Sequence, residues 1–66
     1  MTGNELLDFL INRGCRVVAH AAINVQVACG ACTAIFPGGN DELTTRTQND
    51  IERQLEPCLG SRWLPI

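Results

Sequence analysis

The segment Cys29-Gly30-Ala31-Cys32 constrains the fold of this chain most strongly, because the residues on both sides of it are typical of a β-hairpin. Residues 23–28 alternate apolar and polar side chains, which is the period-two pattern of a half-buried strand. Residues 33–36 continue as strand until the Pro-Gly-Gly sequence at 37–39 ends it. The central Gly-Ala pair, with glycine first, fits a two-residue type II′ turn. The chain is therefore predicted to form an antiparallel hairpin here.

This turn length fixes which residues face each other across the hairpin. It pairs Cys29 with Cys32, and side chains two positions apart then share a face. One face of the hairpin becomes continuously apolar, with these members: Ile23, Val25, Val27, Cys29, Cys32, Ala34 and Phe36. Both cysteines are therefore expected on the core side of the hairpin, as small buried apolar groups.

A helix is predicted over residues 3–13, before the hairpin. The sequence Thr2-Gly3-Asn4-Glu5 fits a capping box, an apolar stripe with helical spacing follows it, and Gly14 is a suitable stop. Residues 16–22 are compatible with a third strand or with an extended segment leading into the hairpin. His20 lies in this segment and is expected to be a partly buried, hydrogen-bonded histidine.

A second helix is predicted to follow the hairpin. Its candidate capping residues are Asn40, Asp41, Thr44 and Thr45. The pair Thr45 and Gln48 fits a second capping box, and Ile51 and Leu55 belong to the apolar stripe of this helix. Because proline breaks a helix interior, this helix is expected to end near Glu56, before Pro57. The whole chain, 1–66, is then one α+β domain of order α-β-β(-β)-α, with a small antiparallel sheet of two to three strands between an N-terminal and a C-terminal helix.

Composition narrows the classes of partner and compartment. The chain has five arginines, no lysine and a net charge of −2, which argues against direct nucleic-acid binding. No apolar run reaches the roughly 18 residues of a membrane span. Residues 1–5 lack the positive charge of a signal peptide, so a cytoplasmic protein with reduced thiols is expected. A disulfide between Cys29 and Cys32 would require strained geometry across so short a turn.

The cysteines also allow a metal-binding alternative. Cys29, Cys32 and Cys58, with either His20 or Cys15, could form a tetrahedral zinc site. Only the first two have the spacing of a zinc ligand pair, so no metal or other cofactor is assigned. A reactive dithiol is not expected either, because residues 33–39 are poor helix formers and a low thiol pKa usually needs a helix N-terminus. No catalytic residues are assigned, and the protein is expected not to be an enzyme.

Two resemblances extend these inferences. The segment Leu6-Leu7-Asp8-Phe9-Leu10, the loop 29–33 and Cys58 together resemble the helix and cluster loop of plant-type [2Fe–2S] ferredoxins. This resemblance maps Cys29, Cys32 and Cys58 onto the last three cluster ligands. The first ligand position holds Asn24 instead, and the opening hairpin of that family has no counterpart. The resemblance therefore implies either an electron-transfer protein or a related fold without its cluster.

In size, mild acidity and lack of catalytic motifs, the chain also resembles the small orphan inhibitors of phages and mobile elements, such as anti-CRISPR proteins. This resemblance implies a monomeric or homodimeric protein that binds and blocks a larger protein or ribonucleoprotein complex. The second helix supplies a mixed-charge face, and Arg62-Trp63, beside Leu64 and Ile66, is a candidate anchor. Trp63 is alternatively expected to fold back over the sheet and complete the small core, which is compatible with an interface on the helix face. The predicted partner-binding residues are Arg46, Asn49, Asp50, Arg53, Glu56 and Trp63.

Overall fold

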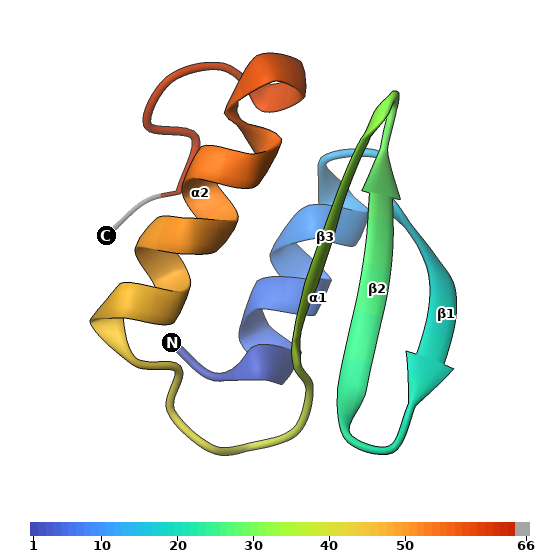
Figure 1. Cartoon of the computed structure of the whole chain (residues 1–66), viewed down its shortest axis with the longest axis vertical. Helices are drawn as coiled ribbons and strands as arrows, with labels where there is room; N and C mark the ends of the chain where they lie inside the picture. Colours follow the sequence, from blue (N-terminus) through green and yellow to red (C-terminus); the bar gives the residue numbers. More distant parts are fainter. Residues whose placement is uncertain (65–66) are drawn as a thin grey trace.

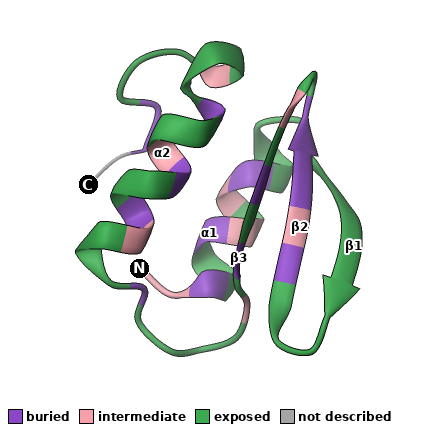
Figure 2. Cartoon of the chain, in the orientation of Figure 1, coloured by how far each residue is buried: buried purple, intermediate pink, exposed green. Residues whose placement is uncertain are grey.

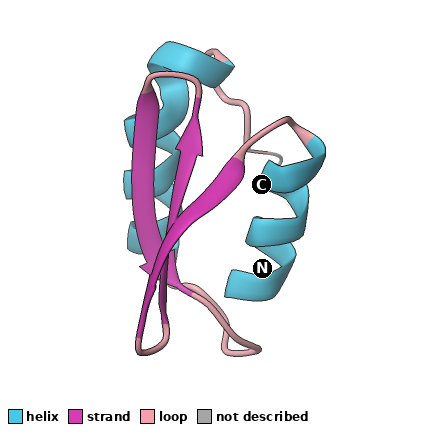
Figure 3. Ribbon diagram, turned by 90° about the vertical axis from the view of Figure 1, so that its right-hand side faces the viewer, coloured by secondary structure: helices cyan, strands magenta, loops and turns pink. Residues whose placement is uncertain are grey.

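A computed structural model of the chain describes residues 1–64. It confirms the α+β class and shows a third strand. The elements are α1 (Gly3–Asn12), β1 (Arg16–Ala21), β2 (Asn24–Cys29), β3 (Cys32–Pro37) and α2 (Thr45–Leu59). The strands form an antiparallel sheet of order β1-β2-β3, and both helices lie on one side of it (Figures 1 and 3).

The hairpin has the predicted register. Cys29 pairs with Cys32, Val27 with Ala34 and Val25 with Phe36. Gly30 has a φ of 65°, as a type II′ turn requires of its first residue. The buried residues of this face pack against the inner stripes of both helices, as the purple segments of Figure 2 show. They form one core with these helical members: Leu6, Leu10, Ile51 and Leu55.

The first helix begins as predicted. The Thr2 side chain accepts from the Glu5 backbone N–H, and the Glu5 carboxylate accepts from the Thr2 backbone N–H, so the capping box is complete. The helix then ends at Asn12, one residue before the predicted end. On β1, His20 is exposed rather than partly buried, because this edge strand has no neighbour on its outer side.

Two predictions about the second helix are wrong. Thr44, one of the predicted capping residues, is the N-cap, but the second capping box does not form, because the buried Gln48 amide donates to the Leu43 carbonyl oxygen at 2.9 Å. The helix also continues through Pro57 to Leu59. A proline removes one backbone hydrogen bond, but here it lies in the last turn, which a disulfide at Cys58 anchors to β3.

The expectation of free, reduced cysteines is also wrong. Cys15 is bonded to Cys29 and Cys32 to Cys58, so all four cysteines form disulfides. Cys29 and Cys32 do lie on the inner face, as the register requires, but each joins a different element rather than its neighbour across the turn. The first bond joins the segment after α1 to β2, and the second joins β3 to α2.

Candidate functional site

The outer face of α2 presents five of the six predicted partner-binding residues together. Their spacing along the helix is that of a single helical face, and all five are exposed to solvent. The inner stripe of the same helix is buried through Ile51 and Leu55. We call this surface the α2 outer face, and it comprises Arg46, Asn49, Asp50, Arg53 and Glu56.

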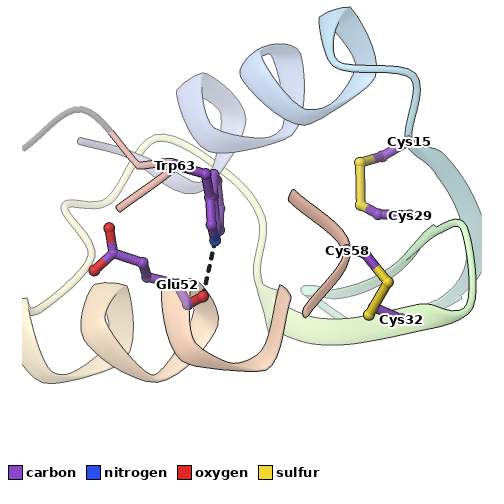
Figure 4. Close-up of a disulfide and its surroundings, with 6 residues drawn as sticks. All are labelled: Cys15, Cys29, Cys32, Glu52, Cys58 and Trp63. Carbon is purple, nitrogen blue, oxygen red and sulfur yellow. Dashed lines mark hydrogen bonds between the residues drawn. A yellow bond between two sulfur atoms is a disulfide. The ribbon is translucent and has the colours of Figure 1, made fainter. Parts of the chain in front are cut away.

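Trp63, the sixth predicted residue, lies in the core instead. Its side chain is only 6% exposed, and its ring stacks on Phe9 with ring centroids 6.1 Å apart. The indole Nε1–H donates to the Glu52 carbonyl oxygen at 2.8 Å (Figure 4). Leu64 beside it is also buried, whereas Ile66 lies outside the described residues. Trp63 therefore anchors the chain against α2 and does not present its ring to a partner.

This anchoring brings Arg62 next to the α2 outer face. A shallow surface depression is lined by Asn49, Glu52, Arg53, Glu56 and Arg62. Arg62 is exposed and has a φ of 53°, in the left-handed region that non-glycine residues seldom occupy. Glu52 holds the adjacent backbone by accepting from the Leu64 N–H at 3.3 Å.

Sequence reasoning considered Arg62 only as part of a candidate anchor with Trp63, and it did not assign Glu52 to the site. Helical periodicity predicts the face of a residue only within the helix, and α2 ends at Leu59. Arg62 lies beyond this end and comes next to α2 because the chain reverses after Gly60. A glycine directly after a helix is a common stop, but it does not indicate the direction of the chain beyond the helix. We therefore define the α2 docking surface as the α2 outer face together with Glu52 and Arg62.

Within residues 1–64, the charged groups of this surface have no ion-pair partners, and the single ion pair joins the N-terminal ammonium group to Glu42 at 2.6 Å, away from α2. The three arginines and three carboxylates of the α2 docking surface thus lie near one another without pairing. All except the Glu52 carboxylate, which accepts from the Leu64 N–H, are available to an external partner of complementary charge.

Other exposed side chains are apolar and lie on the sheet and in the turn between β1 and β2. Ile23, in that turn, is 70% exposed, Ile35 on β3 is 58% exposed, and Val18 is 46% exposed beside the irregularity in β1 pairing. The register places Ile35 opposite Gln26 on the face away from the helices. Sequence reasoning assigned Ile23 to the apolar inner face and did not identify this exposed set.

The structure offers no assembled metal centre or reactive thiol. Residues 1–64 contain no cluster of metal-ligating side chains, and the disulfides leave no thiolate for a zinc or iron–sulfur site. No helix within the same residues is long and apolar enough to cross a membrane. Comparisons with protein families, with curated proteins and with solved structures find no match to this chain.

Proposed function

We propose that this protein is a small non-catalytic binding domain that occludes a surface of a larger protein or ribonucleoprotein. The observation that most supports this proposal is the left-handed backbone conformation of the exposed Arg62. The two residues that follow it, Trp63 and Leu64, are buried, and both donate hydrogen bonds to Glu52. Such conformations cost of order 1–3 kcal/mol and occur disproportionately at functional sites. Here the left-handed conformation lies at Arg62, which is part of the α2 docking surface.

The charge pattern of that surface is suited to partner selection. Arg46, Arg53 and Arg62 alternate with the carboxylates of Asp50 and Glu56, so a partner must present the opposite pattern in the same order. Complementary charges steer encounter and fix register, and like charges brought together disfavour wrong partners. The interleaved acidic groups also disfavour the phosphate backbone of a nucleic acid, which needs an uninterrupted positive patch.

The finer part of the proposal is that this occlusion is inhibitory, in the manner of anti-CRISPR proteins. It rests on the small size, mild acidity and absence of catalytic motifs in the sequence. The oligomeric state in this proposal is a monomer or a homodimer, since the outer edge of β1 is exposed and is a potential pairing edge.

The compartment is a separate proposal. The sequence favours the cytoplasm, whereas disulfides persist mainly in oxidising environments and are rare in the cytosol. Because both disulfides tie together elements of the core, we favour an oxidising environment for the form described here. Alkylation of free thiols directly in cells, before lysis, distinguishes the two compartments.

Site-specific crosslinking tests the proposed surface. A photo-crosslinking residue is placed at Asn49 on the α2 docking surface or at Asp8, an exposed residue of α1. We expect the same macromolecular partner to be captured from Asn49 in repeated experiments and not from Asp8. Equal capture from both positions, or capture from neither, would remove α2 from the interface.

Charge reversal then measures the contribution of the surface. Asp50→Arg combined with Arg53→Glu should lower affinity for the captured partner about 10–100-fold while leaving the thermal unfolding midpoint within a few degrees, because both side chains are exposed. The single variant Asp50→Arg is compared with Asp8→Arg, which changes the net charge equally and should leave affinity unchanged. Unchanged affinity in the double reversal contradicts the proposal.

A further inference from the structure

All four cysteines of the chain meet at one end of the molecule, although they are scattered along the sequence. Cys29 and Cys32 are direct partners across the hairpin. The Cα atoms of Cys15 and Cys29 are 4.4 Å apart, and those of Cys32 and Cys58 are 6.1 Å apart. The Cys58 sulfur also lies next to the hairpin turn, because a Cβ on Gly30, the residue after Cys29, would lie 4.0 Å from it. Figure 4 shows the two sulfur pairs at this end.

We propose that the reduced protein binds one Zn²⁺ ion through the thiolates of these four cysteines. Zinc prefers four tetrahedral ligands and binds thiolate sulfur at about 2.3 Å, so neighbouring sulfurs stand about 3.8 Å apart. The Cα separations within the two pairs keep each pair within the span of two zinc-bound thiolates. The C-x2-C spacing of Cys29 and Cys32 is itself that of a zinc ligand pair. This site is independent of the α2 docking surface and of the proposed function.

The conversion between the two forms balances in electrons and protons. Two molecules of a dithiol reductant transfer four electrons and four protons to the two disulfides, and each reductant molecule becomes a cyclic disulfide. The protein then carries four thiols. Binding of Zn²⁺ replaces the four thiol protons, which pass to the buffer, so zinc affinity rises with pH.

The surroundings of the cysteines suit an anionic zinc–thiolate centre. A surface depression at this end is lined by Cys15, Cys29 and Cys58 together with Arg13, Gly14, Gly30 and Leu59. No acidic residue is among these lining residues, whereas Arg13 is. A cation near the site offsets part of the double negative charge of zinc with four thiolates.

The structure also decides between the two candidates for the fourth ligand. His20 pairs with Val25 on β2, whereas Cys29 lies four residues further along that strand, at its other end. Cys15 lies directly before β1 at the cysteine end and already contacts Cys29. The fourth ligand is therefore Cys15, and His20 takes no part.

A zinc ion bound to the four cysteines would link the same parts of the chain that the two disulfides link. The four cysteines belong to the segment before β1, to β2, to β3 and to the last turn of α2. A single ion would hold the same segments together in a reducing environment, and its binding free energy would contribute directly to folding. A chain of 66 residues has a small core and benefits from such a link in either redox state.

Metal titration of the wild-type protein tests the proposal. The protein is reduced with a dithiol under anaerobic conditions, freed of reductant, and titrated with Co²⁺ as a spectroscopic probe. We expect one equivalent to bind with the visible bands of tetrahedral cobalt and the ultraviolet absorption of cobalt–thiolate bonds. Zn²⁺ should displace it stoichiometrically and restore a cooperative thermal transition. The oxidised protein, identical in sequence, is the matched control and should bind neither ion.

Two variants assign the ligands. Cys58→Ser alters an exposed position and should weaken zinc binding by the reduced protein more than the roughly 10–100-fold that loss of an outer-shell partner costs. His20→Ala should leave zinc affinity unchanged. The proposal is overturned by reduced wild-type protein that fails to bind an equivalent of metal, by a cobalt spectrum without thiolate absorption, or by unchanged affinity in Cys58→Ser.

Discussion

The end of the molecule that carries the turn at residues 30–31 is joined by two covalent bonds, whereas the opposite end is joined by hydrogen bonds and by the ion pair between the N-terminal ammonium group and Glu42. At that opposite end, the start of α1 contacts the loop between β3 and α2. The Asn4 N–H donates to the Gly39 carbonyl oxygen at 2.9 Å, and the Asn4 side-chain oxygen accepts from the Gly39 N–H at 3.1 Å. The Leu43 N–H donates to the Met1 carbonyl oxygen at 2.9 Å.

The two ends differ in what can disrupt them. The cysteine end depends on redox state, because its two links are disulfide bonds. The hydrogen-bonded end depends on close backbone contact, because a Cβ on Gly3 would overlap the Pro37 carbonyl oxygen and lie 2.8 Å from Gly38 Cα. It also depends on charge, through the carboxylate of Glu5 in the capping box. A reductant and a change of pH should therefore act on different ends of the same small fold.

Reduction of both disulfides in the presence of a metal chelator should have the largest effect on stability. Loop-closure entropy assigns about 3 kcal/mol to the first disulfide and about 3.5 kcal/mol to the second, for sequence separations of 14 and 26. Their sum is comparable to the whole stability of a chain this size, roughly 3–10 kcal/mol. We expect the reduced, metal-free protein to be largely unfolded at 25 °C by circular dichroism. An unchanged unfolding midpoint after complete reduction would mean that the cysteine end does not need its covalent bonds.

Gly3→Ala should have the next largest effect, on the hydrogen-bonded end. Helix propensity alone would favour alanine at this position by about 1 kcal/mol. The atoms that the new Cβ would meet belong to the backbone of residues 37–38, however, and cannot rotate away as a side chain can. The overlap should instead cost about 3 kcal/mol in the free energy of unfolding, measured by urea denaturation.

Gly39→Ala is the control for Gly3→Ala. A Cβ on Gly39 meets no atom within 4 Å, but the residue has a φ of 102°, so only backbone strain of about 1–2 kcal/mol is expected. Equal losses for the two variants would show that close backbone contact is not what holds this end together.

These two ends were not equally predictable from the sequence. Hairpin register could be predicted because a two-residue turn and a period-two pattern leave no freedom in the pairing. The capping box of α1 is equally local, since Thr2 and Glu5 lie three residues apart. Disulfide pairing depends instead on which cysteines meet in space, and four cysteines allow three pairings. Cys15 and Cys58 meet the hairpin only after both helices have packed on the sheet.

The candidate site shows the same division between local and tertiary information. Helical spacing correctly exposes Asp50 and Arg53 while burying Ile51 and Leu55. For Trp63 the pattern left two positions open, the core and a partner-binding anchor, because the choice depends on a reversal of the chain after Gly60 and on a hydrogen bond to the Glu52 carbonyl. The same reversal places Arg62 beside α2. Sequence patterns thus predicted the face of the helix, and tertiary packing added the position of Arg62 beside it.

Acid should have the smallest effect of the three perturbations, and it should act on the hydrogen-bonded end. The hydrogen bond from the Thr2 backbone N–H, followed by that with the Thr2 side chain, lowers the pKa of Glu5 below its ordinary value of 4.5. A carboxyl group whose pKa is lowered by folding contributes stability that is present above its ordinary pKa and is lost as pH falls through the folded pKa. Disulfide-bonded cysteines do not titrate, so the cysteine end should not respond in this range.

Thermal unfolding of the oxidised protein between pH 6 and pH 3 measures this contribution, and Glu5→Gln is the matched variant. Glutamine can still accept a hydrogen bond from the Thr2 N–H, but its side chain does not titrate. The variant should therefore be slightly less stable than wild type at pH 6. The difference in stability should shrink as pH falls below 4.5, because wild-type Glu5 then becomes protonated and, like glutamine, uncharged. If the two proteins instead lose stability in parallel across the whole range, acid acts elsewhere in the fold, and the contrast between a redox-dependent end and a charge-dependent end does not hold.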